Sequence, residues 1–166
     1  FFQTRSNVRI FTEAHISDLL REILPQAVLE GSVGPTDLSP PQRSELLEFL
    51  SRFWTYASTH PSAVEAVANG PAVLPVESGG FVPLSRMAGV LSPSRGEAVL
   101  PSDVGTVAMA LGCRMVDLES VGKNHTKLWD YVFSPTRSGL VQAFEILLRA
   151  DSVQFCARIE ALTVDE

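Results

Sequence analysis

The sequence predicts an α+β fold that is mostly helical, with one small β-hairpin or short-strand element packed among the helices. Several stretches place apolar residues at helical spacing, and one stretch carries two short apolar runs separated by Gly79-Gly80. Hydrophobic residues make up 45% of the 166 residues and charged residues 19%, which is typical of a chain with a buried core. We expect residues 1–166 to form a single domain or part of a larger repeat. Residues 1–7 are interpreted as a linker or tag remnant.

The first elements expected are a short strand over residues 8–11 and a helix capped by Thr12, whose hydroxyl can accept a backbone hydrogen bond. This helix carries apolar residues at i, i+3, i+4, i+7 and i+8, which define one apolar face (Ile16, Leu19, Leu20, Ile23 and Leu24). Pro25 ends the helix. Residues 30–38 are rich in glycine and proline and are predicted to form a loop.

The strongest helix start in the chain is at Ser39. Pro40 suits the first helical position, and Gln42 has the spacing of a capping box. A broad apolar face then predicts a helix to about Ser58. A shorter helix is expected to start at Thr59 or His60, before a proline, and to end at 69–70 with the glycine in the left-handed conformation.

The hairpin is predicted over residues 71–84, PAVLPVESGGFVPL. Glycine reaches positive φ at little steric cost, so Gly79-Gly80 between two apolar runs is typical of a hairpin turn. Pro75 and Pro83 cannot donate to a β-ladder, so both strands should be edge strands or irregular. We expect Leu74 and Phe81 to lie in the core.

After the hairpin, the sequence predicts a helical turn over 85–91, a loop over 92–96 and a strand over 98–100. A helix capped by Ser102 or Asp103 should follow and close at Gly112. Residues 113–117 are expected to form another strand, and 122–124 a turn.

The last part of the chain is predicted to be helical. A short helix is expected over 125–132 and is broken by Ser134-Pro135. A longer helix should run from about Thr136 to Arg149, and Asp151 should cap the final helix.

Net charge and composition indicate which classes of binding partner are expected for this chain. The formal net charge is -6, which argues against nucleic acid because phosphate binding needs a basic patch. No apolar run approaches the length of a membrane span, so we expect no membrane partner. Two cysteines fit a reduced intracellular protein, and we expect a cytoplasmic one. A chain that begins Phe1-Phe2-Gln3 is interpreted as a piece of a longer protein.

Catalytic and cofactor signals are weak. Cys113 with His125 is the one candidate for a nucleophile and base, but Cys113 lies in an apolar run, where cysteine usually packs as a small hydrophobe. No zinc-type ligand spacing occurs, and no glycine-rich stretch has the pattern of a phosphate loop. We therefore expect no catalytic residue, no cofactor, no metal and no ATP binding in this segment.

Two aromatic side chains are candidates for a contact surface. Trp129 and Tyr131 lie in the short segment predicted as a helix between two turns. Such a short helix cannot bury every side, so one aromatic ring is a candidate for an interaction surface.

The order of the motifs resembles segments of sacsin and sacsin-like giant proteins. The motifs are ILP (23–25), FLSRFWTYAS (49–58), GPAVLPVESGGFVPL (70–84), LPSDVGTVAMALGCRMVD (100–117) and NHTKLWDYVFSPTRSGLVQAF (124–144). The resemblance covers residues 11–148. Its closest matches are Leu74-Pro75, Val82-Pro83-Leu84, Leu111-Gly112, Ser134-Pro135-Thr136 and Gly139-Leu140.

The resemblance implies a large cytoplasmic, chaperone-like parent with an Hsp90-like ATPase module and a link to the Hsp70 system. This segment matches the part beyond the nucleotide-binding module, whose motifs it lacks. The expected function is a non-catalytic scaffold or interaction module that contacts other parent segments, Hsp70-system proteins or clients. Two alternatives stay open: a peptide-binding adaptor domain, and a small Cys/His hydrolase or transferase using Cys113 and His125.

Overall fold

The computed structural model describes residue 12 and residues 15–24, 26, 38–122 and 125–164. Its helices are α1 (Ile16–Ile23), α3 (Pro40–Thr59), α4 (Pro61–Val67), α5 (Ser102–Ala110), α6 (Leu118–Val121), α7 (Arg137–Ala150) and α8 (Ser152–Val164), with the 3-10 turns η3 (Arg86–Ala88) and η4 (Leu128–Asp130). Its strands are β1 (Ala72–Pro75), β2 (Phe81–Pro83), β3 (Val90–Leu91), β4 (Ser94–Arg95), β5 (Ala98–Val99) and β6 (Arg114–Met115). The predicted α+β, mostly helical class is confirmed. The linker at 1–7, the strand at 8–11 and nearly all of the loop at 30–38 lie outside the described residues.

The predicted hairpin is present. β1 and β2 pair antiparallel with Leu74 opposite Val82, and an irregularity in the register falls between residues 72 and 74. Gly79 has φ +82°, so the turn uses the left-handed freedom of one of its two glycines. All four residues of β1 are buried, and Leu74 and Phe81 both lie in the core, as predicted.

The hairpin extends into a longer strip of β structure. Val76 bridges to Val116, with hydrogen bonds from Glu77 N–H to the Met115 carbonyl (2.9 Å) and from Asp117 N–H to the Pro75 carbonyl (3.0 Å). β6 pairs parallel with β3. On the other side of β3, Leu91 bridges to Phe133. We call this continuous strip, from β2 through β1, β6 and β3 to Phe133, the central ribbon.

The central ribbon separates two hydrophobic cores. Successive side chains of an extended chain point to opposite faces. Accordingly, Val90 belongs to the first core and Leu91 to the second, and the same division holds for the pairs Val116/Met115 and Val132/Phe133. The first core is formed with residues of α1, α3, α4 and the hairpin, and the second with residues of α5 and α7.

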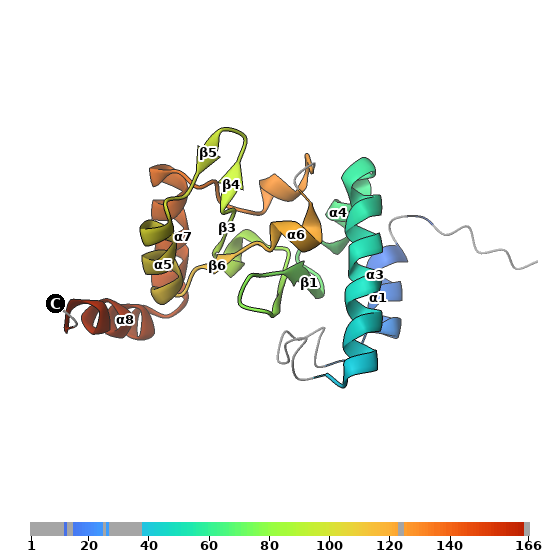
Figure 1. The fold of residues 1–166 in the computed structure, drawn as a ribbon, viewed down its shortest axis with the longest axis horizontal. Helices are drawn as coiled ribbons and strands as arrows, with labels where there is room; N and C mark the ends of the chain where they lie inside the picture. The colour runs from blue at the N-terminus through green and yellow to red at the C-terminus, as the bar shows by residue number, and fades with distance from the viewer. Residues whose placement is uncertain (1–11, 13–14, 25, 27–37, 123–124, 165–166) are drawn as a thin grey trace, which may run out of the picture.

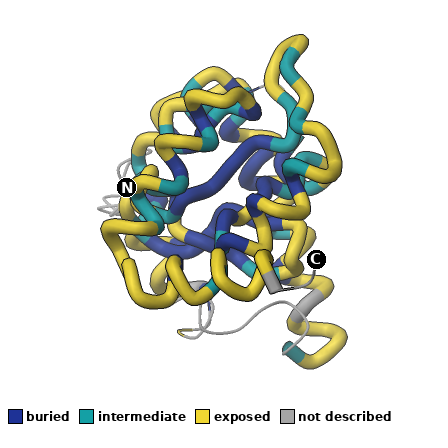
Figure 2. The backbone as a smooth tube through the Cα atoms, turned by 90° about the vertical axis from the view of Figure 1, so that its left-hand side faces the viewer, coloured by how far each residue is buried: buried dark blue, intermediate teal, exposed yellow. Residues whose placement is uncertain are grey.

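The figures show the same arrangement. In Figure 1, α1, α3 and α4 lie at one end of the molecule and α5, α7 and α8 at the other, with the short strands between them. Figure 2 shows the buried backbone running through the middle of the molecule, while exposed segments surround it. α8 extends away from the body in Figure 1, and its Phe155 packs against Phe144 of α7 with ring centroids 6.0 Å apart.

Three of the predicted helix starts are confirmed. The Ser39 backbone N–H donates to Gln42 Oε1 (3.3 Å), as the capping-box spacing predicts. Thr136 Oγ1 accepts from the Gly139 N–H (3.2 Å) at the start of α7. Asp151 Oδ1 accepts from the Gln154 N–H (2.9 Å) at the start of α8. These caps are local in sequence, which explains why the pattern predicts them.

Two predicted caps are wrong. α1 begins after His15, and the Thr12 hydroxyl lies 3.0 Å from His15 Nδ1 instead of capping the helix. α5 begins at Ser102 itself, because the Pro101 carbonyl accepts the first helical hydrogen bond from Gly105 N–H (2.8 Å).

The left-handed residue after α4 also differs from the prediction. The positive φ falls on Asn69 (56°), whereas Gly70 has none. Asparagine tolerates this region better than most residues. An added Cβ at Gly70 would lie 3.1 Å from the Val67 carbonyl oxygen, so close packing is what this glycine provides.

Four short segments differ from their predicted structure. The helical turn predicted over 85–91 holds only for η3, because residues 90–91 form strand β3, which pairs with β6. Residues 94–95, predicted as loop, pair with β5 across a two-residue turn at Gly96, whose φ is +60°. α6 was not predicted at all; the Asp117 carboxylate starts it by accepting from the Glu119 and Ser120 N–H groups. The helix expected over 125–132 is only the single turn η4, since so short a segment gains few hydrogen bonds for the residues it fixes.

The strand predicted over 113–117 is shorter than expected. β6 holds only residues 114–115, and Val116 adds the bridge to the hairpin. The turn predicted at 122–124 falls mostly outside the described residues, although Gly122 itself has φ +83°.

Candidate functional site

Cys113 lies where α5 ends and β6 begins, inside the second core. Its backbone N–H donates to the Ala108 carbonyl (2.9 Å), and its side chain is buried. Burial raises the pKa of the Cys113 thiol to about 12. A cysteine nucleophile reacts as the thiolate, so this thiol has the character of a packed core residue.

His125 is buried beside the first core. Its Nε2 lies 2.7 Å from the Val121 carbonyl oxygen, which can only accept, so Nε2 carries the proton. The ring meets Trp54 edge to face, with centroids 5.6 Å apart. Nδ1 has no hydrogen-bond partner among the described residues. These contacts fix the imidazole against α6 and α3.

The structure does not bring the two candidate catalytic residues together. Cys113 packs in the second core, whereas the ring that His125 touches, Trp54, belongs to the first. Neither side chain has a hydrogen bond to the other among the described residues. The described residues also contain no group of three or more His, Cys, Asp or Glu side chains placed to hold a metal ion.

Trp129 and Tyr131 are half-buried and pack against the first core. The Arg95 guanidinium lies over the Trp129 ring, 5.8 Å from its centroid, in cation–π contact. Both aromatic residues keep some exposed surface, so an interaction surface at this place stays a prediction.

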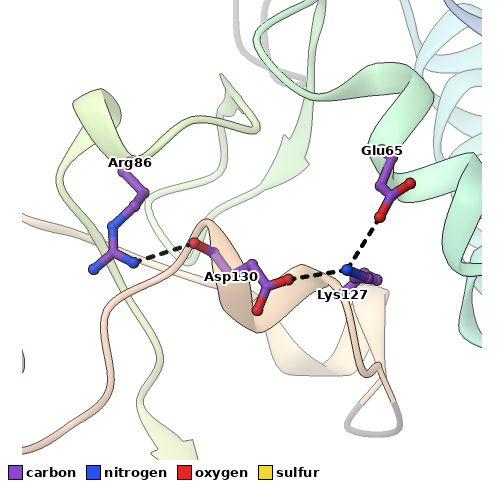
Figure 3. Close-up of polar contacts among 4 residues, drawn as sticks. All are labelled: Glu65, Arg86, Lys127 and Asp130. Carbon is purple, nitrogen blue, oxygen red and sulfur yellow. Dashed lines mark hydrogen bonds and ion pairs between the residues drawn. The ribbon is translucent and has the colours of Figure 1, made fainter.

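A set of polar contacts fastens the segment that carries Trp129 to its neighbours (Figure 3). Lys127 Nζ lies 3.1 Å from Glu65 Oε1 on α4 and 3.6 Å from Asp130 Oδ2. Glu65 first, and then Asp130, raises the pKa of Lys127. Arg86 donates to the Asp130 carbonyl (3.3 Å) and to Gln142 Oε1 of α7 (3.1 Å). These ion pairs are exposed, so their role is to orient the segment more than to stabilise the fold.

An apolar groove lies between α3, the hairpin and α6. It encloses about 310 Å³ and is lined by Leu47, Leu50, Ser51, Trp54, Pro75, Phe81, Glu119 and Ser120. Leu47 is 40% exposed, although it belongs to the broad apolar face that the sequence predicts for this helix. α6 forms one side of the groove, and its absence from the sequence prediction explains why the groove was not foreseen.

A second, more open groove adjoins the first. It encloses about 560 Å³ and is lined by Glu77, Pro93, Asp117, Leu118 and Glu119. Glu119 lines both grooves. No ion pair involves any of the three carboxylates in the part of the chain that the structure describes. Asp117, in contrast, is held in place as the cap of α6 and also accepts from the Ser120 hydroxyl.

Comparisons of the chain with known protein families, curated proteins and solved structures found no significant match. Among the described residues, no helix is long and apolar enough to cross a membrane.

Proposed function

We propose that this chain is a non-catalytic interaction module of a large, sacsin-like chaperone protein. Its partners would be other segments of that protein, Hsp70-system proteins or client proteins. The sacsin-like origin rests on the order of the sequence motifs over residues 11–148. The interaction role rests on the apolar groove between α3, the hairpin and α6.

The groove supports an interaction role because its floor is apolar and buried, while its edge is open to solvent. Trp54 and Phe81 form a buried floor, while Leu47 stands at the rim. The volume lies at the small end of the range of about 300–1,000 Å³ that is usual for ligand sites. This size suits one or two apolar side chains of a partner segment better than a large cofactor.

The enzyme alternative has less support. Cys113 and His125 pack in different parts of the interior, and burial raises the pKa of Cys113. In a Cys156→Ser protein, Cys113 is the only thiol. Slow alkylation of this protein by iodoacetamide at neutral pH is expected while it is folded. Fast alkylation of the folded protein would favour the enzyme alternative.

The interaction role can be tested without knowing the partner. A library of random peptides displayed on phage is selected against the folded chain, and the enriched peptides are then measured against two variants. Leu47→Glu places a charge at the rim of the groove, whereas Leu148→Glu makes the same change on α7 at a leucine of similar exposure (40% and 42%). Enriched peptides should bind the Leu148→Glu protein normally and lose binding to the Leu47→Glu protein.

Two results would contradict the proposal: no peptide enriched, or enriched peptides that bind both variants equally. The sacsin-like origin has its own test, which is the sequence of the complete protein that contains this chain. An Hsp90-like ATPase module on the N-terminal side is expected. A parent without such a module would remove the family assignment and leave the interaction role standing.

A further inference from the structure

We call the second groove, which is lined by Glu77, Pro93, Asp117, Leu118 and Glu119, the acidic groove. It shares Glu119 with the apolar groove, and the two linings differ in polarity. The apolar groove is lined mainly by Leu, Trp, Pro and Phe side chains. The adjoining groove carries the carboxylates of Glu77, Asp117 and Glu119. Among the residues that the structure describes, no lysine or arginine lines either groove. A ligand that spans both therefore meets an apolar site followed by a negatively charged one.

The backbone next to the hairpin turn carries one lining residue of each groove. Pro75 lines the apolar groove and Glu77 lines the acidic one, two positions further along the chain. Two residues of extended chain span about 6.6–6.8 Å. An extended peptide can therefore place one side chain in the apolar groove and one of the next side chains beside the carboxylates.

The charges favour a cationic ligand residue. Coulomb attraction between exposed charges is modest, but three carboxylates around one groove act together on an approaching cation. The chain as a whole carries a net charge of -6, which adds to the attraction. The carboxylate of Asp117 is held by three hydrogen bonds from α6, so it does not need to be ordered on binding.

We propose that the two grooves form one docking surface for an extended peptide in which an apolar residue is followed by lysine or arginine. The inference rests on the proposed interaction function and adds the chemical class of its ligand. The occupant is a protein segment with an apolar anchor and adjacent basic residues.

The test uses short fluorescein-labelled peptides and fluorescence anisotropy. The probe contains one leucine followed by Lys-Arg-Lys, with glycines on both sides. Three further peptides replace the basic residues by Ser-Asn-Ser, replace them by Glu-Asp-Glu, or replace the leucine by glycine. Each is measured against the folded chain, against Glu119→Lys, and against Glu45→Lys, which makes the same charge change on α3 outside both grooves.

The basic peptide should bind the unmodified chain about tenfold more tightly than the acidic one, since a few exposed charge contacts together are worth about 1.4 kcal/mol. Glu119→Lys should reduce this preference at least about fivefold, and Glu45→Lys should leave it nearly unchanged. Raising NaCl from about 50 mM to about 500 mM should also reduce the preference, because salt screens exposed charges.

Each other outcome overturns a defined part of the account. Equal binding of the basic, neutral and acidic peptides, with loss in Leu47→Glu, overturns the basic-ligand inference and leaves the interaction function intact. Equal binding of the peptide without leucine overturns the shared docking surface. If none of the four peptides binds while the phage selection yields peptides that depend on Leu47, the inference fails alone. If the selection fails as well, the proposed function fails with it.

Discussion

The burial of Cys113 can be tested through the pH dependence of folding stability. Burial raises the pKa of the folded-state thiol from 9.0 to about 12. Below pH 9 the thiol is protonated in both the folded and the unfolded chain, so its contribution to stability is fully present. Above pH 9 the Cys113 thiol loses its proton in the unfolded chain before it does so in the folded chain. This contribution is then lost progressively as the pH rises towards 12, at about 1.4 kcal/mol per pH unit.

We therefore expect urea unfolding to show a steeper loss of stability from pH 8 to pH 10 in the unmodified chain than in Cys113→Ala. The difference between the two losses should be about 1 kcal/mol. The variant serves as the control because tyrosines and lysines titrate equally in both proteins. Identical pH dependence in the two proteins would mean that Cys113 is accessible to solvent.

Gly139 gives a second prediction at the residue scale. An added Cβ would lie 2.0 Å from the backbone oxygen of Ser134, and backbone cannot move aside as a flexible side chain can. Gly139→Ala should therefore reduce the free energy of unfolding by about 3 kcal/mol, the upper range for overpacking. Gly80→Ala is the matched control, because no described residue lies within 4 Å of its added Cβ and its φ is not positive.

Chemical denaturation of the two glycine variants provides the measurement. Equal stabilities would show that the turn at Ser134-Pro135 can move away from α7. The structure itself distinguishes two roles of glycine that a sequence does not: Gly139 leaves room for the Ser134 backbone oxygen, whereas Gly79 adopts a positive φ.

Among single residues, the sequence best predicted helix caps whose hydrogen-bond partners are close in sequence. Ser39, Thr136 and Asp151 cap helices through backbone groups within three residues, so the pattern contains the whole interaction. Thr12 and Asp103 have equally good cap chemistry, yet the helices begin elsewhere. The Thr12 hydroxyl lies beside the His15 ring, and α5 begins one residue earlier, from the Pro101 carbonyl.

At the scale of elements, the hairpin is the test case. Phe81 is 3% exposed, packs in the first core and also forms part of the floor of the apolar groove. Phe81→Ala should cost about 3–5 kcal/mol of stability, because the lost transfer free energy and the cavity add together. Ser78→Ala, at the exposed turn of the same hairpin, should change stability by less than about 0.5 kcal/mol.

Thermal melting of both hairpin variants checks this prediction. A Phe81→Ala protein that melts within a degree or two of the unmodified chain would identify the hairpin as a loosely attached flap. In that case its apolar face, and not the groove beside it, would be the surface to examine for partner binding.

The elements that sequence reasoning missed are the shortest ones. α6 has four residues and β4 has two, so neither shows a period that a pattern can reveal. The Asp117 cap was the available signal for α6, but the residue was assigned to a strand instead. α6 supplies Glu119 to both grooves, so the candidate docking surface includes an element that the sequence did not indicate.

At the scale of the whole molecule, the central ribbon explains how such short strands organise the fold. β3 and β6 contain two residues each. Val90 and Leu91 of β3 enter the first and the second core, and Met115 of β6 with the next residue, Val116, does the same in reverse order. The Glu77–Met115 and Asp117–Pro75 hydrogen bonds join the hairpin to β6. The central ribbon is therefore a wall shared by both cores. If the ribbon unfolds, the apolar side chains of both cores become exposed.

The sequence indicated the fold class, the long helices and the hairpin, because periodicity and turn residues are local signals. It did not indicate the ribbon, since its pairings join residues 76 with 116 and 91 with 133. It also did not indicate the groove, which forms only when α3, the hairpin and α6 meet. Its candidate pair, Cys113 with His125, is separated because the two residues pack in different parts of the interior.

The most direct test of the account is whether the two cores unfold together. In a Cys156→Ser protein, labelling of Cys113 reports on the second core, and tryptophan fluorescence from Trp54 and Trp129 reports on the first. Both signals are followed across the same urea series. A shared wall predicts coincident transitions with one midpoint, as in two-state unfolding. Labelling of Cys113 at urea concentrations where the fluorescence is still native would contradict the central ribbon as a single unit.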